Sequence, residues 1–401
     1  ERSRGLGDVY KRQICMTLRN INIMRTKYFL LLFLLLLGAG CATSQYGSEA
    51  TAVLEEGEPS IADTTFLYDS RVIALETKDD ALIARVNRLI EWKGNLYILD
   101  KAGKQVVAFN MDGKHLFTIH RVGMGPEEYS AVMDVAIDKR KNQLVLLTEP
   151  SALLRFDAEG NFIGSRKLPG YYHSIALDGD FIYLENETYA NGRLSENSIT
   201  AIHGEETTGL LEPLIEIAPF CFIAGHQLSA SSHVLFTRKF DNTIYKLENQ
   251  SVSPSYTIDF MNETFPEDAK DKVYDCRDLN KFSTEKGLVY LMTDVTETSE
   301  HLLFRTNLFD RLYILSKWDD AVRKYDYIFQ SEYGYNLHGY TPVGGEKERI
   351  CFVAMAGSLM SLKSLVETYP KVKAKTTVKM LELLNRVEED SNPVLFYYKV
   401  K

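Results

Sequence analysis

Aromatic and histidine side chains in short loops are the residues of this sequence best suited to binding chemistry. Tyr171, Tyr172 and His173 stand together, Trp318 lies in KWDDA, and His338 lies in YGYNLHGY. Aromatic rings held in loops on a rigid scaffold can stack on sugars or peptides. The alternative is that the same rings pack between elements and beneath turns. With that alternative open, we predict that these five residues contact a ligand.

The stretch HRVGMGPEEY offers a second group of candidates. Arg121, Glu128 and Tyr129 carry a charge or a hydroxyl that could reach a ligand near a channel mouth. The architectural alternative is a connection between two strand units. Its backbone would be shaped by residues with special conformational properties, namely Gly123, Gly125 and Pro126. The lysine and Ser/Thr of a phosphate-binding P-loop are absent.

Recognised catalytic and metal-binding patterns do not occur. The eight histidines form no HxH, HExxH or His/Cys cluster, and neither a GxSxG elbow nor a calcium-loop spacing is present. Carboxylates are too numerous for any pair to stand out as a glycosidase pair. We therefore predict no catalytic residue, no metal site and no cofactor. Histidines distant in sequence can still converge in a fold, so an enzyme stays open as the alternative.

The N-terminal region has the pattern of an export signal. We interpret residues 1–23 as a non-native scar with upstream residues, and residues 24–40 as a lipoprotein signal peptide. Its apolar stretch has ten residues, whereas a membrane-spanning helix needs about 20. The small residues GAG precede Cys41, which we predict to be the lipid anchor. Residues 41–65 are polar, and we predict a flexible tether there.

Charge excludes some partners. After removal of residues 1–40, which carry seven Lys/Arg and two Asp/Glu, the net charge is (46 − 7) − (55 − 2) = −14. Such a chain disfavours nucleic acid and an electrostatic hold on anionic lipid. Cys221, Cys276 and Cys351 lack CxxC spacing. They allow one disulfide with one free thiol, or three buried thiols.

Short strand-like segments rich in Val, Ile, Leu, Tyr and Phe fill most of the chain after residue 66. NLYILD, VVAF and MDGKHLF are followed by a similar series, QLVLLTE, LLRF and DAEGNFI. Gly113 and Gly160, 47 residues apart, occupy equivalent hairpin turns. A repeat of about 45 residues with four short strands is typical of a β-propeller blade. The sequence therefore predicts an all-β propeller over residues 66–401.

Two regions depart from the strand pattern. Residues 268–280 are expected to form a short helix. Roughly 358–390 have apolar residues at helical spacing, which predicts two surface helices that interrupt the last blade. The chain then returns in PVLFYYKV. Because a ring of sheets must be closed, we predict that SRVIALET near the start and PVLFYYKV share one blade or lie in neighbouring ones.

The motif series resembles the six-bladed, NHL-like β-propeller lipoproteins of Bacteroidales-type bacteria. GMGPEEY matches that family's Gly-x-Gly-Pro-x-Glu-Tyr loop, and EEDSNPVLFYYKVK matches its C-terminal pattern. The length of residues 66–401 would also allow seven blades of about 45 residues; the resemblance and the helical insertions near the C-terminus favour six. Most members of the family have no assigned activity, so the resemblance implies a fold rather than a function.

These observations lead to a functional expectation. We expect a monomeric binding or scaffold lipoprotein that holds a glycan, peptide or protein partner without turnover and contacts the membrane only through its N-terminal lipid. The alternative is a propeller lyase or hydrolase with an axial active site. ATSQYGSE after Cys41 lacks a dense acidic run, which favours the periplasmic face of the cell envelope over the cell surface.

Overall fold

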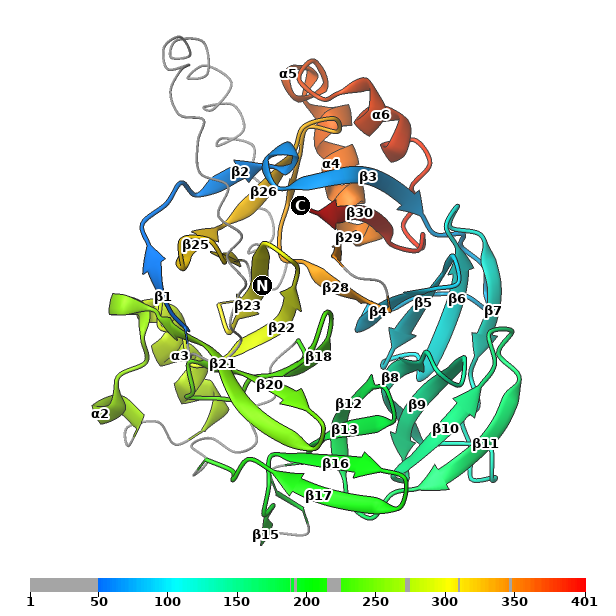
Figure 1. Ribbon diagram of the computed structural model, residues 1–401. Coiled ribbons are helices and arrows are strands. Elements are labelled where there is room, and N and C mark those ends of the chain that lie inside the picture. Colours follow the sequence, from blue (N-terminus) through cyan, green and yellow to red (C-terminus); the bar gives the residue numbers. More distant parts are fainter. Residues whose placement is uncertain are drawn as a thin grey trace, which may run out of the picture. The chain divides into compact units, whose positions relative to one another are not determined.

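The computed structural model describes residues 50–187, 189–190, 193–214, 225–270, 275–308, 311–345 and 348–401. Residues 48–401 form one compact unit, built mainly from short strands (Figure 1). The predicted scar, signal peptide and lipid anchor at Cys41 lie outside the described residues, as does Cys221.

Two sheets consist of four antiparallel strands each, and in both the strands pair in chain order. The first contains β8 (Ala131–Asp138), β9 (Gln143–Glu149), β10 (Ala152–Phe156) and β11 (Phe162–Lys167). The second contains β12 (Tyr172–Asp178), β13 (Phe181–Asn186), β16 (Ile199–His203) and β17 (Glu206–Leu210). A small hairpin separates β13 from β16 and consists of β14 (Tyr189–Ala190) and β15 (Arg193–Leu194).

An eight-stranded sheet contains two further four-stranded segments, joined where β28 pairs with β4. One segment is β4 (Arg88–Trp92), β5 (Asn95–Asp100), β6 (Gln105–Asn110) and β7 (His115–Ile119). The other is β28 (Thr341–Gly344), β29 (Arg349–Ala354), β30 (Val394–Val400) and β3 (Leu67–Ala74).

A nine-stranded sheet likewise contains two four-stranded segments, with β1 (Ala50–Glu55) between them. The segments are β18 (Leu228–Ala230), β19 (Val234–Phe236), β20 (Thr243–Glu248) and β21 (Ser251–Asp259), then β22 (Met292–Glu297), β23 (His301–Thr306), β24 (Leu312–Ser316) and β25 (Ala321–Tyr325). A three-stranded sheet completes the strands with β2 (Ser60–Ala62), β26 (Tyr327–Gln330) and β27 (Tyr335–Leu337).

The predicted repeat is present in the backbone. Gly113, between β6 and β7, and Gly160, between β10 and β11, have the same φ of 82°. This left-handed conformation favours glycine in a tight hairpin. At Gly113 a side chain is also excluded by packing, because a Cβ there would lie 2.2 Å from the carbonyl oxygen of Ala74 in β3.

The innermost strands follow one another around a central axis (Figure 1). Adjacent contacts run through β4, β8, β12, β18, β22 and β28 and return to β4. The first and last strands of one segment, β3 and β30, pair antiparallel, with Val72 opposite Phe396. The prediction that the two chain ends share a sheet is therefore confirmed, and the arrangement is that of a β-propeller-like fold.

The tether predicted over residues 41–65 is wrong for its described part. Residues 50–65 form β1, β2 and the 3-10 helix η1 (Asp63–Thr65). β1 pairs in parallel with both β21 and β25, so it covers the outer edges of two four-stranded segments. The partners of β1, which has the sequence ATAVLE, lie more than 200 residues later in the chain, and only the fold brings them to it.

Helices occupy the predicted regions. They are α2 (Glu267–Lys270), α3 (Cys276–Lys286), α4 (Ala356–Thr368), α5 (Pro370–Lys373) and α6 (Val378–Leu384), with a 3-10 helix η2 (Met261–Glu263). The last three α-helices interrupt the chain between β29 and β30. Leu359 of α4 and Met380 and Leu384 of α6 are buried against the core. Among the described residues, no helix is long and apolar enough to cross a membrane.

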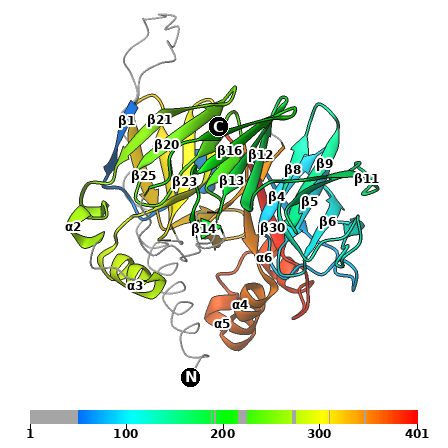
Figure 2. The same cartoon turned by 90° about the horizontal axis from the view of Figure 1, so that it is seen from below.

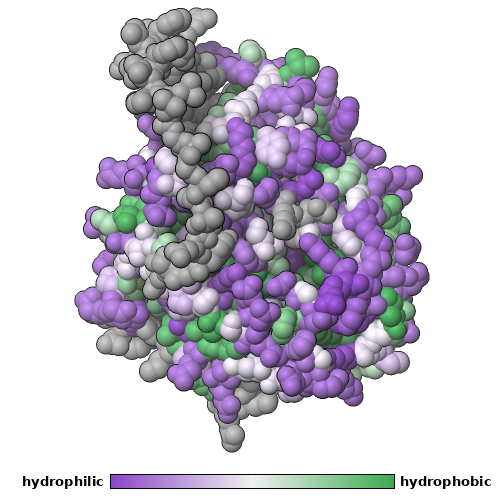
Figure 3. Space-filling model, viewed as in Figure 1, coloured by the Kyte–Doolittle hydropathy of each residue, from purple (hydrophilic) through white to green (hydrophobic). Residues whose placement is uncertain are grey.

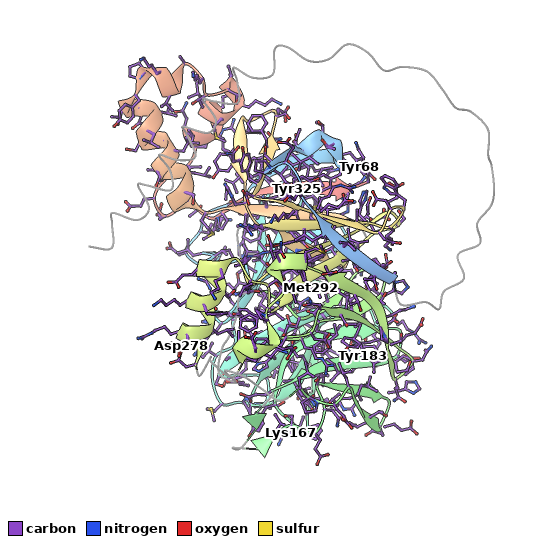
Figure 4. The ribbon with its side chains drawn as sticks, turned by 90° about the vertical axis from the view of Figure 1, so that its left-hand side faces the viewer. Tyr68, Lys167, Tyr183, Asp278, Met292 and Tyr325 are labelled. Atoms are coloured by element: carbon purple, nitrogen blue, oxygen red, sulfur yellow. The ribbon has the colours of Figure 1, made fainter. Side chains whose placement is uncertain are left out.

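The two ends of the ring differ (Figure 2). We call the end that carries α3 and α4–α6 the helix face, and the opposite end the turn face. In Figure 4, Asp278 projects outward with α3, whereas Met292 at the start of β22 lies inside. Because α3 leads directly into β22, the innermost strands begin at the helix face and end at the turn face.

The described cysteines differ in state. Cys276 is disulfide-bonded, whereas Cys351 is free and buried. Burial raises the pKa of the Cys351 thiol far above its ordinary value, so this thiol is unreactive at neutral pH.

Candidate functional site

A cavity of about 460 Å³ lies at the mouth of the central channel on the helix face. In each contributing four-stranded segment, the lining residues lie near the start of the innermost strand or the end of the second strand. Segments that are distant in sequence therefore contribute to one wall. The charged and amide side chains that line it include Lys101, His173, Glu185, His226, Gln227 and Arg238. Ser195 and Asn197, from the segment between β13 and β16, form part of one wall.

A buried ion pair lies at the inner end of this cavity. Arg88 of β4 donates from Nε to Asp134 Oδ1 at 2.6 Å and from Nη2 to Oδ2 at 2.9 Å. The Asp134 side chain is fully buried and also accepts hydrogen bonds from the backbone N–H groups of Val135 and Ile175. One carboxylate therefore ties together the innermost strands β4, β8 and β12.

The Arg88–Asp134 pair separates two cavities. Met133 and Ser174 line the cavity on the helix face. Further along the same strands, Val135 and Ile175 line a second cavity of about 270 Å³. Asp134 lies between them in β8. The ion pair therefore lies between the two cavities, at the inner end of the helix-face cavity.

A second buried cluster centres on Asp294 in β22. Asp294 Oδ1 accepts from the His226 backbone N–H at 3.0 Å and lies 3.2 Å from His226 Nδ1, and Arg305 Nη1 donates to Oδ2 at 3.3 Å. Burial alone would raise the pKa of Asp294, but the hydrogen bond and charge of His226 and the charge of Arg305 lower it overall. Asp294 has a φ of 56° at a shift in the strand register, so the backbone bulges to hold this group in place.

Lys101 is the exception among the cavity cations. It follows β5 and lines the cavity, and its ammonium group has no hydrogen bond or ion pair with a described residue. Burial lowers its pKa below the ordinary value, an effect that the charges of Asp134 and Glu185 only partly oppose. Glu185 is itself held by the Ser174 hydroxyl at 2.6 Å and by the Gln227 side-chain amide.

The structure gives the HRVGMGPEEY stretch an architectural role. Tyr129 is fully buried, and its hydroxyl donates to the carbonyl oxygens of Lys104 and Ile119. Glu128 accepts from the backbone N–H of Gly125 at 2.7 Å, and Arg121 pairs with Glu127. The expectation that Tyr129 lines a ligand surface is corrected by its burial, and neither Arg121 nor Glu128 lines the cavity.

The other predicted contact residues are scattered. His173 lines the cavity, but Tyr172 is buried and Tyr171 is half exposed outside the lining. Trp318 is 78% exposed in the turn between β24 and β25, which places it on the turn face. His338 follows β27 and lies 3.1 Å from the carbonyl oxygen of Asp326. The fold therefore brings only His173 of this group into the cavity.

The sequence analysis missed Lys101, Glu185, Gln227 and Arg238. The strand pattern could have indicated Lys101 and Glu185, because each lies at the end of the second strand of a four-stranded segment. In a propeller-like fold these ends point to one face. Asp100, beside Lys101, shapes the turn by accepting from the backbone N–H groups of Ala102 and Gly103.

Together, the fold and the cavity define a β-propeller-like protein with a polar pocket at one end of its axis. The chain belongs to the family described as domain of unknown function DUF4934, whose sequence model matches residues 51–399. No curated protein sequence matches this chain.

One solved structure shares the fold of this chain, and another shows a weaker likeness. A Bacteroides fragilis protein predicted to be exported is 20% identical, with a TM-score of 0.72, and the match covers 88% of this chain and 100% of that one. A DUF4221 family member from Bacteroides vulgatus is 9% identical, with a TM-score of 0.48 and coverage of 84% and 98%. At such identities the first match speaks for the fold alone.

Proposed function

We propose that the protein is an exported, lipid-anchored six-bladed β-propeller that binds a polar ligand in the helix-face cavity without chemical turnover. The blades are the four-stranded segments described above: β4–β7, β8–β11, β12 with β13, β16 and β17, β18–β21, β22–β25, and β28–β30 with β3. The ligand classes are a glycan, a peptide or a segment of a protein partner, and the protein acts as a monomer.

The observation that carries this proposal is the state of the charged groups around the cavity. Arg88 is paired with Asp134, and His226 and Arg305 are paired with Asp294. A general base or nucleophile must be available to the substrate. The side chains of these two clusters instead hydrogen-bond to one another and link neighbouring strands. What faces the cavity is a rigid polar lining, which suits recognition.

Export and anchoring draw on two observations. The B. fragilis structure that shares the fold is of a protein predicted to be exported, and Cys41 follows a sequence with the pattern of a lipoprotein signal. Outside the grey atoms, the face seen in Figure 3 is covered mainly by hydrophilic residues, with apolar ones in small separate groups. A lipid on Cys41 would then be the principal membrane contact, on the periplasmic side.

The chain direction sets the orientation of such an anchored protein. β1 runs parallel to β21, so Ala50 lies toward the turn face and the strand runs toward the helix face (Figure 2). Cys41 to Glu49 are nine residues and reach at most about 30 Å. The turn face would therefore lie nearer the membrane, and the cavity would open away from it.

A binding screen tests the proposal. Purified residues 42–401, which contain the whole compact unit, are screened against glycan and peptide arrays, and hits are measured by calorimetry. We expect at least one ligand class to bind, with affinity lost in Gln227→Ala and retained in Gln143→Ala, whose side chain lies outside the cavity. Absence of binding to every probe would refute the proposal.

An enzyme remains the second candidate, because His226, Asp294 and Arg305 do converge on the axis from different parts of the chain. Incubating the same protein with each bound ligand and analysing products by mass spectrometry decides between them. Cleavage that disappears in His226→Ala would replace the binding proposal with a propeller lyase or hydrolase.

A further inference from the structure

We propose that Lys101 binds the carboxylate of an acidic sugar, so that the ligand of the helix-face cavity is a uronate-containing oligosaccharide. This inference rests on the proposed binding function and names its ligand class. It follows from three features of the cavity: an ammonium group without a partner among the described residues, the pairing of the neighbouring cations Arg88 and Arg238, and a lining rich in hydrogen-bonding side chains.

The pairing of the neighbouring cations singles out Lys101. Arg238 donates to Asp241 at 2.7 Å, to the Tyr245 hydroxyl at 3.1 Å and to the Glu212 carbonyl oxygen at 2.7 Å. Arg88 is used by Asp134. An anionic group that enters the cavity can therefore bind the ammonium group of Lys101, which has no hydrogen bond to a described residue.

The carboxylates near Lys101 do not replace such a ligand. Asp134 already accepts from Arg88 and from two backbone N–H groups, and Glu185 accepts from Ser174 and Gln227. Both charges act on Lys101 without a hydrogen bond, and burial still lowers its pKa. A ligand carboxylate would supply the direct partner that a desolvated ammonium group lacks.

The rest of the lining favours a sugar over a peptide. Hydroxyl and amide groups stand along the wall, including Ser174, Asn186, Asn197, Ser198 and Gln227. Such groups both donate and accept, which matches sugar hydroxyls. Leu214, which lines the cavity and is 40% exposed, supplies an apolar surface, and such a surface suits the apolar face of a sugar ring.

Calorimetry with matched saccharides tests the inference. The probes are tetrasaccharides of galacturonate, glucuronate, mannuronate and guluronate, each beside its carboxyl-reduced neutral form, and peptides with free or amidated C-termini. We expect one uronate tetrasaccharide to bind residues 42–401, and its neutral form to bind ~10- to 100-fold more weakly, the range of a charge-assisted hydrogen bond.

Variants assign the effect to Lys101. Lys101→Met should weaken uronate binding by the same ~10- to 100-fold and leave binding of the neutral form unchanged, whereas Lys101→Arg should keep most of the affinity. Lys141→Met, an exposed lysine in the turn between β8 and β9, is the matched control. Because Lys101→Met removes a desolvated charge, its melting temperature should stay the same or rise.

The outcomes separate the two proposals. If neutral glycans or peptides bind and Lys101→Met leaves their affinity unchanged, the acidic-sugar inference is overturned and the binding function stands. A peptide that needs its free C-terminus and Lys101 would also overturn it. A marked fall in the melting temperature of Lys101→Met would assign this residue a structural role instead. If no probe binds at all, the binding function itself falls.

Discussion

Arg88 and Asp134 join the neighbouring innermost strands β4 and β8 through two parallel hydrogen bonds, at 2.6 and 2.9 Å. The aspartate also receives a backbone N–H from the third strand, at Ile175. This pair lies between the two cavities and links the innermost strands of three adjacent four-stranded segments. It is therefore a structural element on which the shape of the candidate site depends.

Breaking this pair should be costly. In Arg88→Met the Asp134 carboxylate stays buried without its cation, so we expect a loss of about 3–5 kcal/mol in the free energy of unfolding. Arg166→Met is the matched control, because its pair with Glu205 is exposed and should contribute about 1 kcal/mol or less. Urea unfolding measures both, and equal losses in the two variants would contradict the assignment.

The contact between the first hairpin and the closing strand can be tested at Gly113. Alanine there must adopt a φ of 82° and place its Cβ 2.2 Å from the Ala74 carbonyl oxygen. Gly179→Ala is the control, since its φ of 58° is also left-handed but nothing lies near the added Cβ. We expect about 1–2 kcal/mol of destabilisation in the control and about 1–3 kcal/mol more in Gly113→Ala. Similar melting temperatures for the two variants would show that β3 does not pack on this hairpin.

Acid should weaken the fold through Glu297, which accepts from Lys317 at 2.7 Å and lies 2.6 Å from His233 Nδ1. Burial would raise its pKa, but hydrogen bonds from His233 and Lys317 and their charges lower it below the ordinary 4.5. A carboxyl group with a lowered folded pKa contributes stability above its unfolded pKa and loses it as the pH falls through the folded value.

The wild-type melting temperature should therefore fall as the pH drops below 4.5. Glu297→Gln should be less stable at pH 7 and show a flatter dependence in the acid range. Glu205→Gln, at a 99% exposed side chain, should reproduce the wild-type curve. Calorimetric scans at several pH values give the comparison, and an unchanged acid slope in Glu297→Gln would remove this residue from the explanation.

The proposed lipid anchor predicts an orientation on the membrane. A fluorophore on Lys141→Cys, in the turn between β8 and β9, should transfer energy to a membrane dye more efficiently than one on Lys375→Cys, after α5 on the helix face. Cys41→Ser in either background should abolish membrane association and the transfer. Equal transfer from both positions would exclude an orientation with the cavity facing away from the lipid.

Local patterns were sufficient for the strands, their turns and the late helices. NLYILD and QLVLLTE became β5 and β9, whose side chains are almost all buried, because continuous apolar segments of this length favour buried strands. Gly113 and Gly160 marked their hairpins since the conformation they adopt is a local property of the backbone. The pairing of β3 with β30 could also be foreseen, because a ring leaves few partners for its ends.

Only the tertiary structure decided the rest. The sequence of β1 was predicted to be part of a tether. It forms a strand because β21 and β25 are the outer strands of their segments and β1 pairs with both. The cavity depends in the same way on Lys101, Asp134 and Glu185, which lie in three separate four-stranded segments. The local sequence determines which residues can form a strand. Which strand ends lie together is determined by the direction of the strands and by the closure of the ring of four-stranded segments. For that reason the strands could be predicted from the sequence, whereas only the fold shows that the Lys101 ammonium group lies at a polar cavity without a partner in the described part of the chain.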